Sequence, residues 1–316
     1  MKRWVLWSSA GIGAIIIGAG IPISLHYHTA HTDLQDAQYD LRRNRLSAAS
    51  TALTAAQQAW PFVIVAPIRS QISRAQQVNA NFEQGVNALD QGHWHEARQY
   101  FSAIPAWSAH AAGANHWLNR LNTAEADASI ATAVLRQGTT INQDINQFWT
   151  DSNGLGTTLN QLKSTLNAFS SFFYPSSASS GPSSSTLLTT GTNQMGAVSA
   201  DAATIQTAIG TFSQTTSNLP ATWTHIATTA LLTSSNAMAQ QISNLSNDLS
   251  NDLTWDSQNE PNYVNFTTSN ALSAQLQSAQ VGYQNDLLVF RGQVLTLLQT
   301  VLGPHIPVSS LIPTAP

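Results

Sequence analysis

The sequence contains no cysteine, and this absence excludes several kinds of chemistry at once. A chain without cysteine has no disulfide, no thiol nucleophile and no thiolate ligand for a metal ion. If such a chain is exported, its fold must depend on packing alone, because disulfides are the usual staples of exported domains.

Charge is also scarce, since only 9% of the 316 residues are Asp, Glu, Lys or Arg, against about 25% in an ordinary soluble domain. Lysine occurs only as Lys2 and Lys163. Beyond Arg136 the basic residues are Lys163 and Arg291, and they stand against eight acidic residues. A phosphate backbone is bound by clustered Lys and Arg, so we expect no nucleic-acid partner.

Ser, Thr, Asn and Gln take the place of the missing charge. An acidic exterior is one physical reason for this composition, because carboxylates protonate as pH falls and ion pairs are then lost. A lineage-wide preference for these residues in surface proteins explains the composition equally well.

Catalytic signatures are missing as well. The chain has no Gly-x-Ser-x-Gly elbow, no Walker loop, no Gly-x-Gly-x-x-Gly and no His-Glu-x-x-His. These motifs are the common local signs of nucleophilic, nucleotide-binding and zinc-dependent enzymes. We therefore predict a protein that is not an enzyme and that needs no cofactor.

One long run of uncharged, mostly apolar residues is Val5–Leu25. About 20 such residues are enough to cross a bilayer as a helix. Lys2 and Arg3 precede the run, and basic residues beside a span tend to stay in the cytoplasm. We predict a transmembrane signal-anchor over residues 4–25 and a cytoplasmic stub over 1–3. The protein would then be a single-pass protein of the cell membrane with the bulk of its chain extracytoplasmic.

A cleaved signal peptide is the alternative interpretation of the same run. Signal-peptide cores usually extend over about 7–15 residues and end at a small-x-small site. Here apolar residues continue to the end of the run, and Ala19-Gly20-Ile21 is a poor cleavage site, which favours an uncleaved anchor. Both interpretations place the following residues outside the cytoplasm.

Residues 31–122 have the pattern of paired amphipathic helices. Small residues on one helix allow a second helix to approach closely, and aromatic residues fill the space between neighbouring pairs. The clearest pair has Gly85, Ala88 and Leu89 on its first helix, Gly92 at the turn, and Trp94, Ala97 and Phe101 on its second helix.

A weaker copy precedes this pair, with Asn44 at the position of the turn glycine, because Asn tolerates the left-handed conformation. The pattern resembles the tetratricopeptide (TPR) repeat in a degenerate form. The resemblance implies a scaffold that binds a protein or peptide; helical hairpins without any ligand remain the alternative. The other residues of the weaker copy are Ala37, Leu46, Ala49 and Leu53, with Pro61 at its end.

Beyond residue 123 the apolar residues follow a spacing of three and four, in four successive seams. This pattern predicts a long four-helix, coiled-coil-like bundle over residues 123–302, with a Ser-rich linker over 174–186 and a loose Pro-rich tail over 303–316. The first seam passes Asn153-Gly154 without a change of phase, which predicts one continuous helix there. The whole chain is therefore predicted to be all-α. The seam residues are Ile141, Ile145, Phe148, Ser152, Leu155, Leu159, Leu162, Leu166, Phe169 and Phe173; Met195, Val198, Ala202, Ile205, Ala208 or Ile209, and Phe212; Trp223, Ile226, Ala230, Met238, Ile242, Leu245, Leu249 and Leu253; and Leu276, Tyr283, Leu287, Phe290, Val294, Leu297 and Val301.

Histidines are the only metal-ligand candidates worth weighing. His26, His28 and His31 follow the predicted span, and three imidazoles so close together suit zinc or copper. No convincing carboxylate ligand accompanies them, so solvated side chains are the favoured interpretation. Asp248, Asp252 and Asp256 recur every four residues along one helix face; such a row can hold a cation, but a hydrated outer face is more common, and we expect the latter.

These observations lead to one main functional hypothesis. We expect a membrane-anchored, extracytoplasmic helical scaffold that binds a protein or a cell-envelope component, with Trp94, Trp107 and Trp117 as aromatic contact residues. One alternative is a structural spacer or oligomerisation stalk on the cell surface. A second alternative is an envelope protein that binds a metal or small ligand through the membrane-proximal histidines. The sequence leaves the oligomeric state open.

Overall fold

The computed structural model describes residues 25–170, 182–223, 226, 228–257 and 266–313. All regular structure within these ranges is helical, so the prediction of an all-α protein is confirmed for them. Of the predicted span 4–25, only the last residue is described. None of the helices in the described ranges has both the length and the apolar character needed to cross a membrane.

The chain divides into two compact units between Asn122 and Thr123. This boundary falls within helix α5, Ala111–Ser170. The sequence pattern also changes at this point, from paired helices to long seams. The two units are described separately below.

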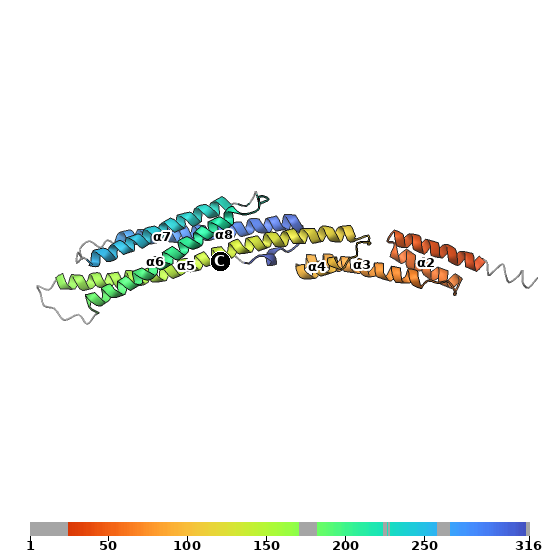
Figure 1. Ribbon diagram of the computed structural model, residues 1–316, viewed down its shortest axis with the longest axis horizontal. Helices are drawn as coiled ribbons and strands as arrows, with labels where there is room; N and C mark the ends of the chain where they lie inside the picture. Colours follow the sequence, from red (N-terminus) through yellow and green to blue (C-terminus); the bar gives the residue numbers. More distant parts are fainter. Residues whose placement is uncertain (1–24, 171–181, 224–225, 227, 258–265, 314–316) are drawn as a thin grey trace, which may run out of the picture. The chain divides into compact units, whose positions relative to one another are not determined.

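The first unit consists of two helical pairs followed by the start of α5 (Figure 1). Residues 25–42 are helical and precede α2, Leu46–Ala59. The second pair is α3, Ala66–Asp90, and α4, Trp94–Ser102. A core of small and branched side chains joins the first pair to the beginning of α3; it contains Ala37, Ala49, Leu53, Val65, Ile68 and Ile72.

The turns within the two pairs have the same backbone geometry. Asn44 has a φ of 56° and Gly92 a φ of 74°, so each turn contains one left-handed residue, as the sequence predicted. In both turns the backbone amide after the left-handed residue donates a hydrogen bond to the carbonyl oxygen five residues earlier. Arg45 N donates to Asp40 O at 2.9 Å, and His93 N donates to Ala88 O at 2.8 Å. A left-handed residue with such a bond caps the carbonyl end of a helix. Both first helices therefore end by the same mechanism.

The second pair is closely packed at Gly85. A Cβ atom placed there would lie 2.7 Å from Cε1 of Phe101, which is too short for any side chain to be tolerated without movement. Phe101 is itself fully buried and its ring lies parallel to that of Trp117, with 6.3 Å between centroids. Gly85 thus allows the two helices to approach closely, and Phe101 fills the space beside it, as their spacing predicted.

The second unit contains the rest of α5 with α6, Ser184–Ser217, α7, Thr228–Ser257, and α8, Phe266–Leu302. These four helices lie side by side in Figure 1. α5 is continuous through Asn153-Gly154, as predicted. Contacts between the helices include Trp149 Nε1 of α5, which donates to Oε1 of Gln280 on α8 at 3.0 Å.

Most predicted seam residues within the described ranges are buried, but two stretches are out of phase. On α7, Ala230 is exposed and Leu231 is buried. At the end of α8, Leu298 and Leu302 are fully buried, whereas the predicted Leu297 and Val301 are only half-buried. A straight helix has 3.6 residues per turn, so a strict heptad drifts around it by about 20° per repeat. At the end of α8 the buried row has therefore moved by one residue. At Ala230 the predicted seam was continued from Trp223 and Ile226, which lie before α7 begins at Thr228, so their spacing did not set the phase of the helix. The side chains of Leu166, Phe169 and Phe173 lie outside the described residues.

The prediction of a loose C-terminal tail is wrong for residues 303–313. Ile306, Val308 and Ile312 are buried, and Nε of Arg291 donates to the carbonyl oxygen of Pro313 at 2.8 Å. A short 3-10 helix, η1, covers Ser309–Leu311. The apolar residues between the prolines supply enough buried surface to hold this segment against the second unit.

Threonine side chains on the outer helix faces share one arrangement. Many of these hydroxyls donate to the backbone carbonyl oxygen four residues earlier, as Thr204 does to Ala200 at 2.9 Å and Thr296 to Gly292 at 3.1 Å. This bond competes weakly with the helix ladder. It also gives an exposed hydroxyl a partner within its own helix.

Two glycines on α5 provide a matched test of this packing. A Cβ atom at Gly138 would lie 2.7 Å from Cδ2 of the buried Leu287, whereas one at Gly156 would meet nothing within 4 Å. We expect Gly138→Ala to lower the free energy of unfolding by about 1–3 kcal/mol through overpacking. Gly156→Ala should raise it by about 0.5–1 kcal/mol, because Ala is the better helix former. Urea denaturation followed by circular dichroism measures both changes, and equal effects of the two substitutions would contradict the packing described.

Candidate binding site

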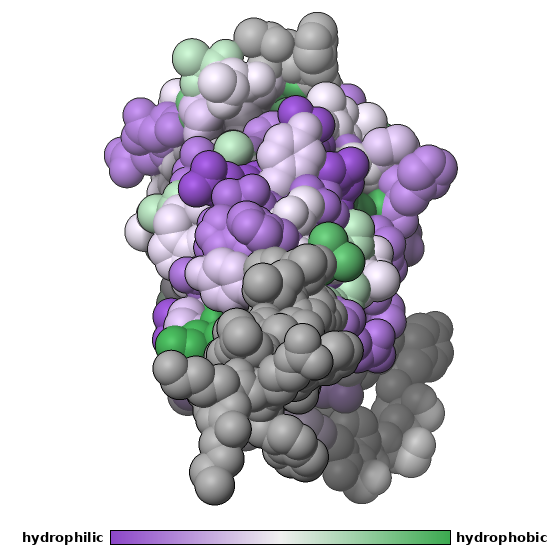
Figure 2. Space-filling view, turned by 90° about the vertical axis from the view of Figure 1, so that its right-hand side faces the viewer, coloured by the Kyte–Doolittle hydropathy of each residue, from purple (hydrophilic) through white to green (hydrophobic). Residues whose placement is uncertain are grey.

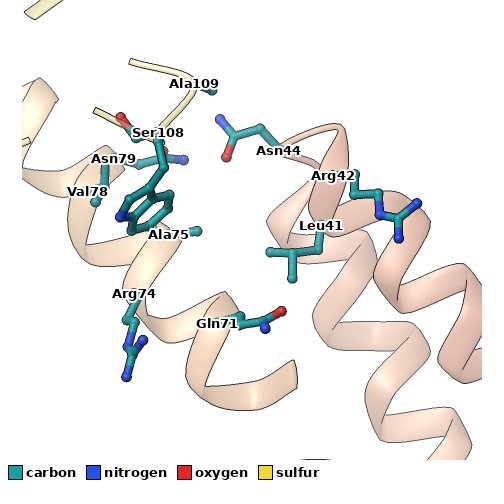
Figure 3. Close-up of a pocket in the computed structure, with 11 residues that line it drawn as sticks. Leu41, Arg42, Asn44, Gln71, Arg74, Ala75, Val78, Asn79, Ser108 and Ala109 are labelled. Carbon is teal, nitrogen blue, oxygen red and sulfur yellow. The ribbon is translucent and has the colours of Figure 1, made fainter. Parts of the chain in front are cut away.

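The first unit has a groove between its two helical pairs (Figure 3). The groove has a volume of about 440 Å³. One wall is the end of the helix over 25–42 and the following turn, and the other is the middle of α3. The loop between α4 and α5 closes one end. The lining residues are Leu41, Arg42, Asn44, Gln71, Arg74, Ala75, Val78, Asn79, Trp107, Ser108 and Ala109.

The groove combines apolar surface with side-chain amides. Leu41 is half-buried and Val78 is buried, so they form an apolar base. Asn44, Gln71 and Asn79 come from both walls, and each carries a hydrogen-bond donor and an acceptor. Figure 3 shows Asn44 directed across the groove towards Ser108 and Asn79. A surface of this kind can bind a ligand that has both apolar side chains and peptide groups.

The hydroxyl group of Ser108 is a polar group of this lining that has no hydrogen-bond partner. Its Oγ is shielded from water and has no hydrogen-bond partner in the structure. A shielded polar atom without a partner costs about 1–3 kcal/mol, so such atoms call for an explanation. A bound group at this end of the groove would supply the missing hydrogen bond.

The three tryptophans proposed as contact residues have different positions. Trp107 is 67% exposed and lines the groove. Trp94 is half-buried at the start of α4. Trp117 is half-buried, stacks on Phe101, and carries the guanidinium of Arg120 over its ring at 4.7 Å. The structure therefore places only Trp107 in the groove, and the contacts of Trp117 are those of a packed residue.

His26, His28 and His31 all lie on the exposed first helical segment. His28 and His31 are one turn apart, and the ring of Tyr27 lies beside both, with centroids 6.2 and 6.3 Å away. No group of three or more His, Asp or Glu side chains within the described ranges is arranged to hold a metal ion.

The acidic row on α7 is not a hydrated outer face, so that expectation is wrong. Asp252 is 8% exposed, and both it and Asp248 face α8. Ser269 Oγ lies 2.6 Å from Oδ2 of Asp248 and 2.9 Å from Oδ2 of Asp252. Because a hydroxyl carries one proton, it donates to one carboxylate at a time. The side chain of Asp256 lies outside the described residues.

Burial raises the pKa of Asp252. The neighbouring negative charge of Asp248 acts in the same direction, whereas the hydrogen bond from Ser269 and the positive charge of Lys163 lower it.

A second carboxyl pair lies between α5 and α6. Burial raises the pKa of Asp201 to about 6, with further contributions from a hydrogen bond with Asp151 and from the negative charges of Asp151 and Asp144. One oxygen of Asp201 is shielded from water and accepts no hydrogen bond. Two carboxyl groups so placed hold a proton more strongly than either would alone.

No protein family, curated protein or solved structure matches this chain.

Sequence analysis identified Trp107 but missed the rest of the groove. Arg42, Arg74 and the amides belong to segments that are distant in the sequence, and only the turn at Asn44 and the packing of α3 bring them together. A concentration of arginine between residues 42 and 120 was the one available signal, because few basic residues occur later.

The carboxyl pair at Asp201 predicts a pH dependence of stability. Because its pKa is raised from 3.8 to about 6 in the folded protein, Asp201 adds stability that is fully present below about pH 3.8 and is lost as pH rises through about 6. Asp201→Asn removes this proton equilibrium. We expect the substitution to raise the melting temperature at neutral pH and to change it less in mild acid.

Thermal melts between about pH 4 and pH 7.5 test this expectation. Ser199→Asn, an exposed change on the same helix, is the control and should leave the pH profile unchanged. Parallel profiles for the wild-type protein and Asp201→Asn would contradict the assignment.

Proposed function

We propose that this protein is a membrane-anchored, extracytoplasmic helical scaffold that binds a protein or cell-envelope component. The observation that carries the proposal is the groove of the first unit, where the exposed Trp107 adjoins apolar and amide side chains. Large exposed aromatic residues are common energetic centres of protein interfaces. The anchor is the predicted span over residues 4–25.

The repeated geometry of the first unit supports this proposal. Two helical pairs with equivalent left-handed turns at Asn44 and Gly92 are the arrangement that the TPR-like resemblance implies. Stacked helical pairs create extended surfaces between them, and such surfaces are used for binding. The groove lies at this position, between the first pair and α3.

Among the described residues, large apolar side chains are exposed at several separate places, which include Phe62, Ile64 and Trp107. The face shown in Figure 2 is mainly hydrophilic, with small separate hydrophobic areas among the residues that are coloured. Trp107 is the member of this set that lines the groove, and an exposed aromatic side chain within a groove favours a specific contact over general adhesion.

Site-specific photo-cross-linking from residue 107 tests the proposal. A benzoylphenylalanine replacing Trp107 in the full-length protein should give a discrete heavier adduct in intact membranes, because the side chain is exposed in the groove. Ala75→Trp in the same protein should fill the groove and reduce the adduct by about tenfold. The matched control places the cross-linker at Gln58, which is exposed on α2. No adduct, or the same adduct from both positions, would contradict the proposal.

One observation favours the second candidate, an oligomerisation stalk. Val281, Leu288 and Val289 on α8 are each about half exposed, at 51, 50 and 53%. They are spaced by about two helical turns and therefore lie on one side of the helix. An apolar row of this kind suits a contact between copies of the protein.

Leu288→Glu tests the stalk directly. If α8 forms a contact between copies, the substitution should convert the oligomer to a monomer, because a carboxylate in an apolar contact loses its hydration. Sedimentation of the full-length protein in detergent gives the mass. Gln206→Glu adds the same charge at an exposed site on α6, outside the apolar row, and should have no effect. A wild-type protein that is already monomeric would exclude this function.

A further inference from the structure

The arginines of the first unit differ in whether the structure gives them a partner. Most are engaged within the unit. Arg45 pairs with Asp40, and Arg43 lies over the ring of Tyr39 at 4.4 Å. Arg69 donates to Gln57 at 2.7 Å and Arg98 to Asn122 at 2.7 Å, while Arg120 lies over Trp117.

Arg42 and Arg74 are the exceptions within the described part of this unit. Both are exposed, and neither has a hydrogen bond, an ion pair or a ring contact with another described residue. Both belong to the lining of the same groove. Figure 3 shows them on its opposite walls, with both side chains extending outward from the space between the walls. Because both side chains are long and exposed, rotation about their side-chain bonds brings either guanidinium group to the edge of the groove.

The lining of the groove contains no Asp or Glu. The two guanidinium groups therefore have no counter-charge within the groove. A ligand that carries carboxylates would supply it, and the planar guanidinium binds a carboxylate through two parallel hydrogen bonds. Electrostatic complementarity of this kind fixes the register of a partner and speeds its association.

We propose that the groove binds an extended acidic peptide segment of a partner protein. This inference rests on the proposed function and adds the chemistry of the partner. Carboxylates of the segment pair with Arg42 and Arg74 at the two margins. Between them, the amides of Asn44, Gln71 and Asn79 bond to the peptide backbone. An apolar side chain of the segment packs against Leu41, Val78 and Trp107.

The rest of the lining favours a peptide over an isolated phosphate or a lipid headgroup. A phosphate is compact and is normally held by several converging donors. Here the cations lie on opposite walls, with apolar surface and amides between them. Only a ligand with negative charges separated by apolar and peptide groups uses all of these features.

Selection from a random library of displayed dodecapeptides tests the proposal with the full-length protein in detergent. The selected peptides should be enriched in Asp and Glu and should contain at least one large apolar residue. A labelled selected peptide should lose about three- to tenfold in affinity with either Arg42→Gln or Arg74→Gln, as expected for partly exposed ion pairs. Its affinity should also fall as salt is raised.

Arg69→Gln is the matched control, because Arg69 is an exposed arginine of α3 outside the groove lining. It should leave the affinity unchanged. Inorganic phosphate and vesicles of phosphatidylglycerol serve as competing probes. The proposal is overturned if the selection yields no peptides, or if the selected peptides have no acidic enrichment. It is also overturned if they bind the double variant Arg42→Gln/Arg74→Gln equally well, or if only phosphate or the vesicles bind.

The two proposals fail in distinguishable ways. An adduct from residue 107 that persists in the double variant would keep the scaffold function and reject the acidic partner. Absence of any adduct would reject the scaffold function itself.

Discussion

Contact between narrow rows of apolar side chains holds the helices of each unit together. The chain has few charges to pair, so the register of one helix against another is set mainly by shape. Gly85 against Phe101 and Gly138 against Leu287 show how closely the surfaces meet. Such contacts are sensitive to single methyl groups, because protein interiors are packed as densely as organic crystals. The groove depends on the same constraint, since the packing of α3 positions one of its walls.

The sequence predicts the type of each element well where a local rule decides it. Helix periodicity and the need for a left-handed residue gave the turns at Asn44 and Gly92, and both are local properties. The continuous helix through Gly154 followed from the unbroken seam.

Prediction failed where the heptad departs from true helix geometry or where distant segments decide the outcome. The end of the α8 seam drifted to Leu298 because helix geometry, not the heptad, determines which residue faces inward. Asp252 was expected in water because the sequence did not indicate that Ser269 would face it. The groove could not be predicted for the same reason, since Arg42 and Arg74 come to line one groove only in the folded unit.

The exposed threonines have a consequence for how this protein meets its surroundings. Each hydroxyl that donates its proton to its own helix, as at Thr204 and Thr296, presents only lone pairs and a methyl group to the outside. These threonines therefore add no free donor to a surface that also carries little charge with which to attract other macromolecules. The solubility of the protein should therefore depend weakly on ionic strength. Its surface should also bind unrelated macromolecules only weakly in a crowded solution.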